Sequence, residues 1–351
     1  YKRQLQIARD NTFVSRVPEA VCEAYGIDPS CLEPIAGGLI NETFAVLGES
    51  GPAFVLQRLH PIFAGEVNLD IDAITTRLQT EGLSTPVLVR TSTDRLWIEV
   101  DGQGWRLMTY VNGTTVDKID DPRAARAAGE LVGRFHRALL DFDHTFAFSR
   151  PGAHDTEGHL AALAAVTSGT DEAAALSTEI REFAASRPIW GTLPERICHG
   201  DLKISNIRFE GLEPPVARCL LDLDTLGRLT LPYELGDAFR SWCNPNREDV
   251  RPQFRTDVFA AGMRGYCQAV GGSVEDAEIA AIPAGIETIC VELAARFCRD
   301  VFEDSYFGWD AERYPTRRAH NLARARSQLA LAGLVRGLQN ELERALEEAL
   351  P

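Results

Sequence analysis

An eight-residue run, His-Gly-Asp-Leu-Lys-Ile-Ser-Asn at positions 199–206, constrains the fold of this chain more than any other stretch. It follows the apolar pair Ile197-Cys198 and precedes a second apolar run that ends at Asp222. The interval between Asn206 and Asp222 is long enough for two short strands and a turn. We therefore expect a strand-loop-strand unit that brings Asp201, Asn206 and Asp222 to one place.

A carboxylate, an amide and a second carboxylate at one place suit phosphoryl transfer from ATP. That reaction needs a hydroxyl held in line with the terminal phosphate and divalent metal over the phosphate charge. Asp201 would orient the hydroxyl and accept its proton. Asn206 and Asp222 would supply the oxygen ligands that Mg²⁺ prefers, and Asp224 is either a further ligand or a partner of Asp222. The pattern indicates a small-molecule kinase.

Composition narrows the partners of the chain. Its 351 residues allow two lobes, and its net charge of −15 argues against binding to nucleic acid or to anionic membranes. No run approaches the roughly 20 apolar residues of a membrane helix, and the beginning of the sequence lacks a signal-peptide core. The eight cysteines form no Cys-x-x-Cys pair, and several lie in apolar stretches, as buried reduced thiols do. We expect a cytoplasmic protein.

The first third of the sequence reads mainly as strands and turns. Two β-prone runs with a Gly-Glu-Ser-Gly-Pro turn between them predict a hairpin over 42–56. Apolar residues at spacings of three and four predict an amphipathic helix over 67–81. Further strands are expected at 85–89, 96–100 and 105–111. Together these elements predict a small antiparallel sheet with one helix.

The pattern changes to helix after Asn112-Gly113. Asp121-Pro122 supplies an N-cap and a proline at the first helical position, and another helix is expected over 171–186. Leucines at every fourth position over 334–350 predict one last helix. The predicted fold class is α+β, with a small antiparallel-sheet lobe that binds nucleotide over 1–111 and a larger, mostly helical lobe for catalysis and substrate over 112–351.

The catalytic loop and its surroundings resemble the aminoglycoside phosphotransferase/choline kinase superfamily, a branch of the protein-kinase-like fold. The resemblance covers nearly the whole chain and implies ATP as donor, Asp201 as catalytic base, and Asn206 and Asp222 as magnesium ligands. Lys203 matches a lysine that many such kinases keep near the γ-phosphate, although a solvated loop lysine is the alternative. The chain is not similar to a protein kinase proper, because His-Gly-Asp replaces His-Arg-Asp.

Two further residues of this region are interpreted as structural. His199 is expected to hold the backbone of the loop rather than to titrate in catalysis. Asp237 resembles the superfamily's acid that braces the catalytic loop from the following helix.

Within the superfamily, the sequence resembles the N-acetylhexosamine 1-kinases, which phosphorylate the anomeric hydroxyl of N-acetylglucosamine or N-acetylgalactosamine. The resemblance rests on matching stretches at 38–44, 55–58, 221–225 and 235–240, with less diagnostic ones at 292–297 and 314–322.

One position departs from the usual kinase pattern. Nucleotide kinases place a lysine on the third strand to bind the α/β-phosphates, and this chain has Gln57 there. Arg58 follows, but the alternation of side chains along a strand points it to the opposite face. The sugar 1-kinases also use glutamine here. The residues assigned to nucleotide binding are Gly37, Gly38, Asn41, Gln57, Thr109 and Val111, with a plain turn as the alternative for the two glycines.

Candidate acceptor-binding residues are Arg240, Trp242, Arg296 and Tyr314. An aromatic plane beside polar side chains suits a sugar, whose ring faces are apolar and whose hydroxyls need directional partners. For Arg296, a solvated ion-pair ladder with Glu292 and Asp300 on one helix face is the alternative.

Three functions remain open at this point. The first is an ATP- and Mg²⁺-dependent sugar kinase, and the second is a kinase of an aminoglycoside or amino alcohol. The third, motivated by Gln57, is a nucleotide-binding pseudokinase without catalysis. The sequence identifies neither the acceptor nor the oligomeric state.

Overall fold

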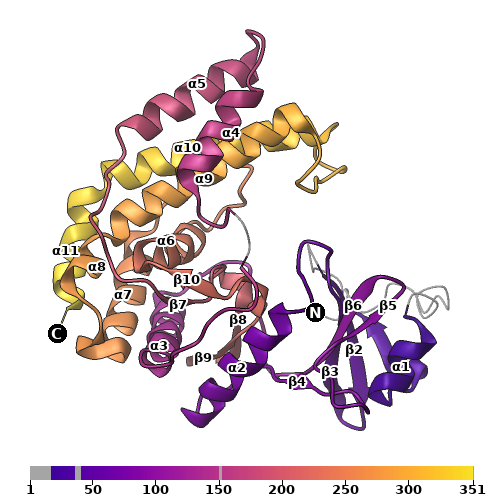
Figure 1. The fold of residues 1–351 in the computed structure, drawn as a ribbon. Helices are drawn as coiled ribbons and strands as arrows, with labels where there is room; N and C mark the ends of the chain where they lie inside the picture. The colour runs from indigo at the N-terminus through magenta and orange to yellow at the C-terminus, as the bar shows by residue number, and fades with distance from the viewer. Residues whose placement is uncertain (1–16, 36–40, 150–151, 351) are drawn as a thin grey trace. The chain divides into compact units, whose positions relative to one another are not determined.

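The computed structural model describes residues 17–35, 41–149 and 152–350, which form two compact units (Figure 1). The first unit contains the described part of Tyr1–Thr76, together with Pro86–Val111 and Thr145–Phe148. The second unit contains the remaining described residues. The predicted α+β class is confirmed, because the first unit is built around a six-stranded antiparallel sheet and helices make up most of the second unit.

The sheet of the first unit is antiparallel throughout its named pairs, and its strands follow the order β1-β2-β3-β6-β4, with β5 paired to β6. The predicted hairpin is formed by β2 and β3, and the predicted helix is α2. The bounds are β1 (Leu32–Pro34), β2 (Glu42–Gly48), β3 (Gly51–Arg58), α2 (Val67–Thr80), β4 (Leu88–Val89), β5 (Ile98–Val100) and β6 (Gln103–Thr109).

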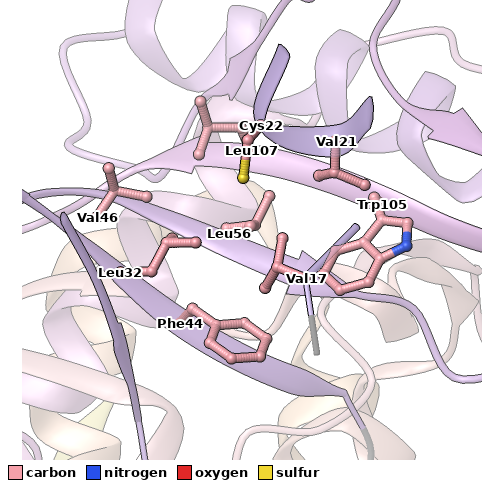
Figure 2. Packing of buried hydrophobic residues seen from close by; sticks show 9 residues of the cluster. All are labelled: Val17, Val21, Cys22, Leu32, Phe44, Val46, Leu56, Trp105 and Leu107. Atoms are coloured by element: carbon pink, nitrogen blue, oxygen red, sulfur yellow. The ribbon is translucent and has the colours of Figure 1, made fainter. Parts of the chain in front are cut away.

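One face of this sheet forms a hydrophobic core with helix α1 (Glu19–Tyr25) (Figure 2). Leu56 of β3 and the β6 residues Trp105 and Leu107 pack there with Val21 of α1. Side chains alternate between the two faces of a strand. The intervening residues Gln57 and Arg106 therefore belong to the opposite face of the sheet.

The second unit combines helices with two short antiparallel strand pairs, β7–β10 and β8–β9. The expected helices at 121 and 171 are α3 and α5, and the side chain of Asp121 caps α3 as predicted. The bounds are α3 (Pro122–Ala138), α4 (Thr156–Val166), α5 (Glu172–Ala185), β7 (Arg196–Cys198), β8 (Ile207–Leu212), β9 (Pro215–Leu220), β10 (Gly227–Leu229), α6 (Leu231–Trp242), α7 (Thr256–Val270), α8 (Asp276–Ala280), α9 (Ile282–Glu303), α10 (Arg317–Gly337) and α11 (Gln339–Ala349).

Helix α9 packs against both α6 and α10 (Figure 1). Gly285 of α9 permits the close approach to α6, because a Cβ at this position would lie 1.9 Å from the carbonyl oxygen of Pro232. This contact fixes α6, the helix that supports the loop described below.

The prediction of one last helix is wrong. The helix breaks at Leu338 between α10 and α11, so the leucines do not share one face. Leu334 is 40% exposed, whereas Leu342 is fully buried. No helix among the described residues combines the length and the apolar character needed to cross a membrane.

Candidate active site

The loop at 199–206 joins β7 to the hairpin β8–β9, and the hairpin brings the chain back beside the loop. The backbone N–H of Leu221 donates to the Asn206 carbonyl oxygen at 2.8 Å. The ring of His199, which is fully buried, places Nε2 2.8 Å from the Leu221 carbonyl oxygen and accepts the Asp201 backbone N–H at Nδ1. These bonds set Asp222, the next residue after Leu221, next to the loop.

The four charged and amide side chains expected at the site lie together. Lys203 Nζ lies 2.6 Å from Asp201 Oδ2 and 3.9 Å from Asp222 Oδ2. Asn206 Nδ2 donates to the backbone carbonyl oxygen of Asp201 at 2.9 Å and to its Oδ2 at 3.1 Å. Because the amide nitrogen makes both bonds, Oδ1 is the Asn206 atom suited to bind a metal ion.

The pKa values of these groups reflect a local excess of acid. Burial raises the pKa of Asp201, but the charge and hydrogen bond of Lys203 outweigh burial and hold that pKa below its ordinary value. Burial, followed by the charge of Asp224, raises the pKa of Asp222. Asp224 is itself buried. Lys203 therefore does not offset all of the carboxylate repulsion, and a divalent cation held by oxygen ligands fits the site.

The backbone of the loop is held by Glu234 in the first turn of α6. Its buried carboxylate accepts the N–H groups of His199 and Gly200, each at 2.8 Å, and His136 Nε2 lies 3.4 Å away. The prediction that Asp237 braces the loop is wrong, because Asp237 is bonded to Arg240 instead.

Glu234 was not among the residues predicted from the sequence, although its position in the helix indicates a special role. It is an acidic residue on the apolar face of its helix, three residues after Leu231 and four before Ala238. Burial raises the pKa of Glu234, but its bonds from His136 and the loop amides outweigh burial and lower it. The residue is therefore a charged anchor for the loop.

The other end of α6 supports the loop as well. Ser241 Oγ accepts the backbone N–H of Ile204 at 3.1 Å. Trp242 Nε1 donates to the Leu202 carbonyl oxygen at 2.7 Å, and the Trp242 side chain is 2% exposed. The proposed contact of Trp242 with the acceptor is therefore corrected: its ring is packed in the core, and its one polar atom holds the loop.

Position 200 of the loop requires a glycine because of its backbone conformation. Its φ of +78° lies in the left-handed region, and a Cβ there would be 2.4 Å from the Thr225 carbonyl oxygen. Thr225 Oγ1 also donates to the His199 carbonyl oxygen at 2.8 Å. Glycine thus allows the loop to close against Thr225.

Arg240 lies near the catalytic loop, within electrostatic reach of Asp201. Its guanidinium bonds Asp237 at 3.0 Å and Glu248 at 3.2 Å. The second oxygen of Asp237, Oδ2, is buried and has no hydrogen-bond partner among the described residues. Burial and then the charge of Asp201, set against that of Arg240, raise the pKa of Asp237.

His154 lies near Asp237 and belongs to a second polar cluster, which also contains Glu292. His154 Nδ1 is buried without a described hydrogen-bond partner and lies 3.7 Å from Glu292 Oε1. The His154 ring stacks on Tyr233, with ring centroids 5.7 Å apart. The loop thus has buried carboxylates and an aromatic surface in its neighbourhood.

The remaining acceptor candidates differ in position. Arg296 Nη1 lies 3.7 Å from Glu292 Oε1, which places it beside this polar group. The Arg296 ladder does not extend to Asp300, because that carboxylate accepts the backbone N–H groups of 305–307. Tyr314 lies in another cluster, where its hydroxyl donates to the Asp249 carbonyl oxygen and its ring stacks on His320.

The candidates for nucleotide binding belong to the first unit. Asn41 Oδ1 accepts the backbone N–H of His60, and Thr109 Oγ1 accepts that of Val87. Gln57 is bonded to Arg106, an arrangement considered below. Val111 lies two residues beyond the end of β6. Gly37 and Gly38 lie outside the described residues.

Residues 32–268, more than half of the chain, match the sequence profile of a family described as the phosphotransferase enzyme family. The match confirms the predicted superfamily and the predicted class of enzyme, a phosphotransferase. It does not distinguish the N-acetylhexosamine 1-kinases from other members.

Solved structures with the same fold cover almost all of the chain. One is the amicoumacin kinase hAmiN in complex with AMP-PNP, Ca²⁺ and Ami, with 14% identity, a TM-score of 0.64, and coverage of 94% of this chain and 96% of that one. A microcompartment-associated aminopropanol kinase has 15% identity, a TM-score of 0.64 and coverage of 95% and 99%. A choline/ethanolamine kinase family protein from Mesorhizobium loti has 16% identity, a TM-score of 0.58 and coverage of 96% and 97%. These similarities confirm the kinase-like fold.

Proposed function

Because the chain belongs to the phosphotransferase enzyme family, we propose that it is an ATP-dependent kinase that phosphorylates a hydroxyl group of a small molecule. One observation carries this proposal: Lys203 lies within 4 Å of both Asp201 and Asp222, and Asn206 is bonded to Asp201. Phosphoryl transfer depends on such positioned charges more than on covalent chemistry.

Each of these side chains has a role in the proposed reaction. Asp201 accepts a hydrogen bond from the acceptor hydroxyl, orients it and takes its proton. Lys203 keeps Asp201 ionised and supplies positive charge for the γ-phosphate. Asn206 and Asp222 are the residues that would hold Mg²⁺. Asp224 is a buried carboxylate near Asp222. When bound, the ion neutralises phosphate charge.

The proposed acceptor is a sugar, and the favoured hydroxyl is the anomeric one of an N-acetylhexosamine. Support comes from the resemblance to the sugar 1-kinases and from the mixed character of the groups near Asp201. The Asp237 carboxylate can accept hydrogen bonds from sugar hydroxyls, and the Arg240 guanidinium can donate them. Tyr233 and His154 offer an aromatic surface. Sugars are bound by such combinations of directional polar groups and apolar faces.

An amino alcohol or an aminoglycoside is the second candidate acceptor. The buried Asp237 Oδ2, which has no described hydrogen-bond partner, favours it, because an ammonium group would satisfy that oxygen. Glu292 adds another buried carboxylate nearby. Structures named for an amicoumacin kinase and an aminopropanol kinase share the fold.

An acceptor screen tests the proposal. The purified chain is given ATP and Mg²⁺ with hexosamines, neutral hexoses, aminoglycosides, choline or homoserine, and release of ADP is measured. We expect turnover with an N-acetylhexosamine, and NMR coupling between phosphorus and the anomeric proton of the product. Asp201→Asn, which removes the carboxylate and keeps the size, should lower kcat about 10²–10⁴-fold without loss of nucleotide binding.

The outcomes separate the candidates. Turnover with an amine-bearing acceptor alone would contradict the sugar proposal and leave the kinase assignment in place. Nucleotide binding without turnover of any acceptor would contradict the kinase assignment and favour a pseudokinase.

We also propose a cytoplasmic location. The eight cysteines are free thiols, and all but Cys31 are buried. Such thiols are typical of reducing compartments.

A further inference from the structure

The position that lacks the strand lysine is paired with a buried arginine. In the register of the sheet, Gln57 of β3 stands opposite Arg106 of β6, and both belong to the face away from the α1 core. Arg106 Nε and Nη2 donate to Gln57 Oε1 at 2.9 and 2.7 Å. Arg106 is only 1% exposed. The Arg106 guanidinium therefore lies against the oxygen of the Gln57 amide.

Helix α2 contributes a third member of this group. Asn68 is fully buried, and its Nδ2 donates to the Gly65 carbonyl oxygen at 2.8 Å. This bond turns its Oδ1 toward Arg106, whose Nη1 lies 3.4 Å away. A neutral amide of α2 thus contacts the cation, in a fold where a lysine–glutamate pair usually joins the third strand to a helix.

The contacts fix which way the Gln57 amide points. Its oxygen accepts both bonds from Arg106, so its Nε2 is directed to the other side. Nε2 lies 3.4 Å from Thr43 Oγ1 on the adjacent strand β2, a long and weak contact. Gln57 is only half-buried. Strand β3 therefore presents the Gln57 Nε2 donor, and the bonds from Arg106 to Gln57 Oε1 fix its orientation.

The same geometry explains why lysine is absent at position 57. A lysine there would bring its ammonium group against the buried Arg106 guanidinium, and like charges at such short distances repel strongly. Glutamine supplies an acceptor for Arg106 and a donor for a ligand in one side chain. The two residues are chemically dependent on each other.

We propose that Gln57 and Arg106 act as a unit in the place of the strand lysine. Gln57 binds an α- or β-phosphate oxygen of the nucleotide through Nε2. Arg106 is a positioning residue that orients this amide and supplies positive charge behind it. The inference rests on the proposed function in one respect, namely that the chain binds a nucleoside di- or triphosphate.

Gln57→Glu is the decisive variant, because it separates stability from binding. The new carboxylate still accepts both bonds from Arg106, so the fold keeps its support. The amide donor is replaced by an anion that repels phosphate. Calorimetry on the purified chain should show ADP affinity reduced about 10- to 100-fold, the worth of a charge-assisted hydrogen bond. Adenosine affinity should change less than about twofold, and Tm should not fall.

Two more variants test the positioning role and the specificity of the effect. Arg106→Gln should weaken ADP binding more than adenosine binding, and the charge exchange Gln57→Lys with Arg106→Gln should recover ADP affinity. Arg58→Gln is the matched control, since Arg58 is the next residue, lies on the opposite face and is paired with Glu42. It should leave ADP affinity unchanged.

Each result decides between the alternatives. Wild-type ADP affinity in Gln57→Glu would overturn the inference and leave the kinase proposal intact. Equal losses of ADP and adenosine binding in Arg106→Gln, without recovery in the charge exchange, would show a merely structural arginine. A wild-type chain that binds no ADP would contradict both the inference and the proposed function.

Discussion

The catalytic loop and the β3–β6 strand pair both bring charged and amide side chains together, but they are built differently. In the loop, Asp201, Lys203 and Asn206 lie within six positions of one another, and backbone turns bring them together. In the strand pair, Gln57 and Arg106 are far apart in sequence and meet only through sheet register. Spacing along the chain therefore reveals the first group of residues, whereas only the pairing of the strands reveals the second.

Helix α6 holds the backbone of the loop, whereas the register of the sheet joins Gln57 to Arg106 and helix α2 adds one contact through Asn68. Glu234, Ser241 and Trp242 of α6 all hold loop backbone. We therefore expect substitutions in α6 to lower kcat and the stability of the second unit. They should not lower the affinity for ADP relative to adenosine, as substitution of Gln57 is expected to do.

The largest effect on stability should come from Glu234→Ala. It leaves two loop amides and His136 without their acceptor in a buried site, which should cost about 3–5 kcal/mol of unfolding free energy and most of kcat. Denaturant unfolding measures the first and steady-state kinetics the second. Glu347→Gln, an exposed control on α11, should stay within about 0.5 kcal/mol of wild type. A small effect at Glu234 would show that the loop holds itself.

Gly200→Ala should have the next largest effect. The left-handed backbone costs an alanine about 1–2 kcal/mol, and its Cβ would also collide with the Thr225 carbonyl oxygen. Gly102→Ala is the matched control, because Gly102 has a φ of +71° and no atom within 4 Å of its Cβ position. If the two variants show the same decrease in unfolding free energy and the same kcat, the close approach of Gly200 to Thr225 contributes neither to stability nor to catalysis.

Trp242→Phe should cost less. It keeps most of the packed ring but leaves the Leu202 carbonyl oxygen without its donor, a loss of about 1–3 kcal/mol in unfolding free energy. Because the ring is buried in the core, KM for the acceptor should stay within a factor of about two of wild type. A large rise in KM with unchanged stability would restore Trp242 as a substrate contact.

The smallest effect is a pH dependence. The pKa of Glu234 is lowered in the folded protein, so its contribution is fully present above the ordinary glutamate pKa of about 4.3. It is lost as the pH falls through the folded-state value. The unfolding free energy of wild type relative to Glu234→Gln should therefore decline only below pH 4 or so. A difference that is constant down to the lowest measurable pH would contradict a charged Glu234.

Much of the fold and part of the candidate site could be predicted from the sequence. The hairpin, helix α2 and the cap of α3 follow from local patterns, and so does the convergence of Asp201, Asn206 and Asp222. The brace by Glu234 could not be assigned, because Glu234 and Asp237 lie on the same short helix and only packing decides which one meets the loop. Trp242 was misread for a similar reason: its spacing is compatible with either the core or a ligand.

The sequence by itself determined the motif chemistry and the α+β class, because both depend on residues close together in the chain or on periodicity. The tertiary structure decided which acid supports the loop and which cation is bonded to Gln57. Both answers depend on residues that are distant in sequence and adjacent in space, and no spacing along the chain encodes that adjacency.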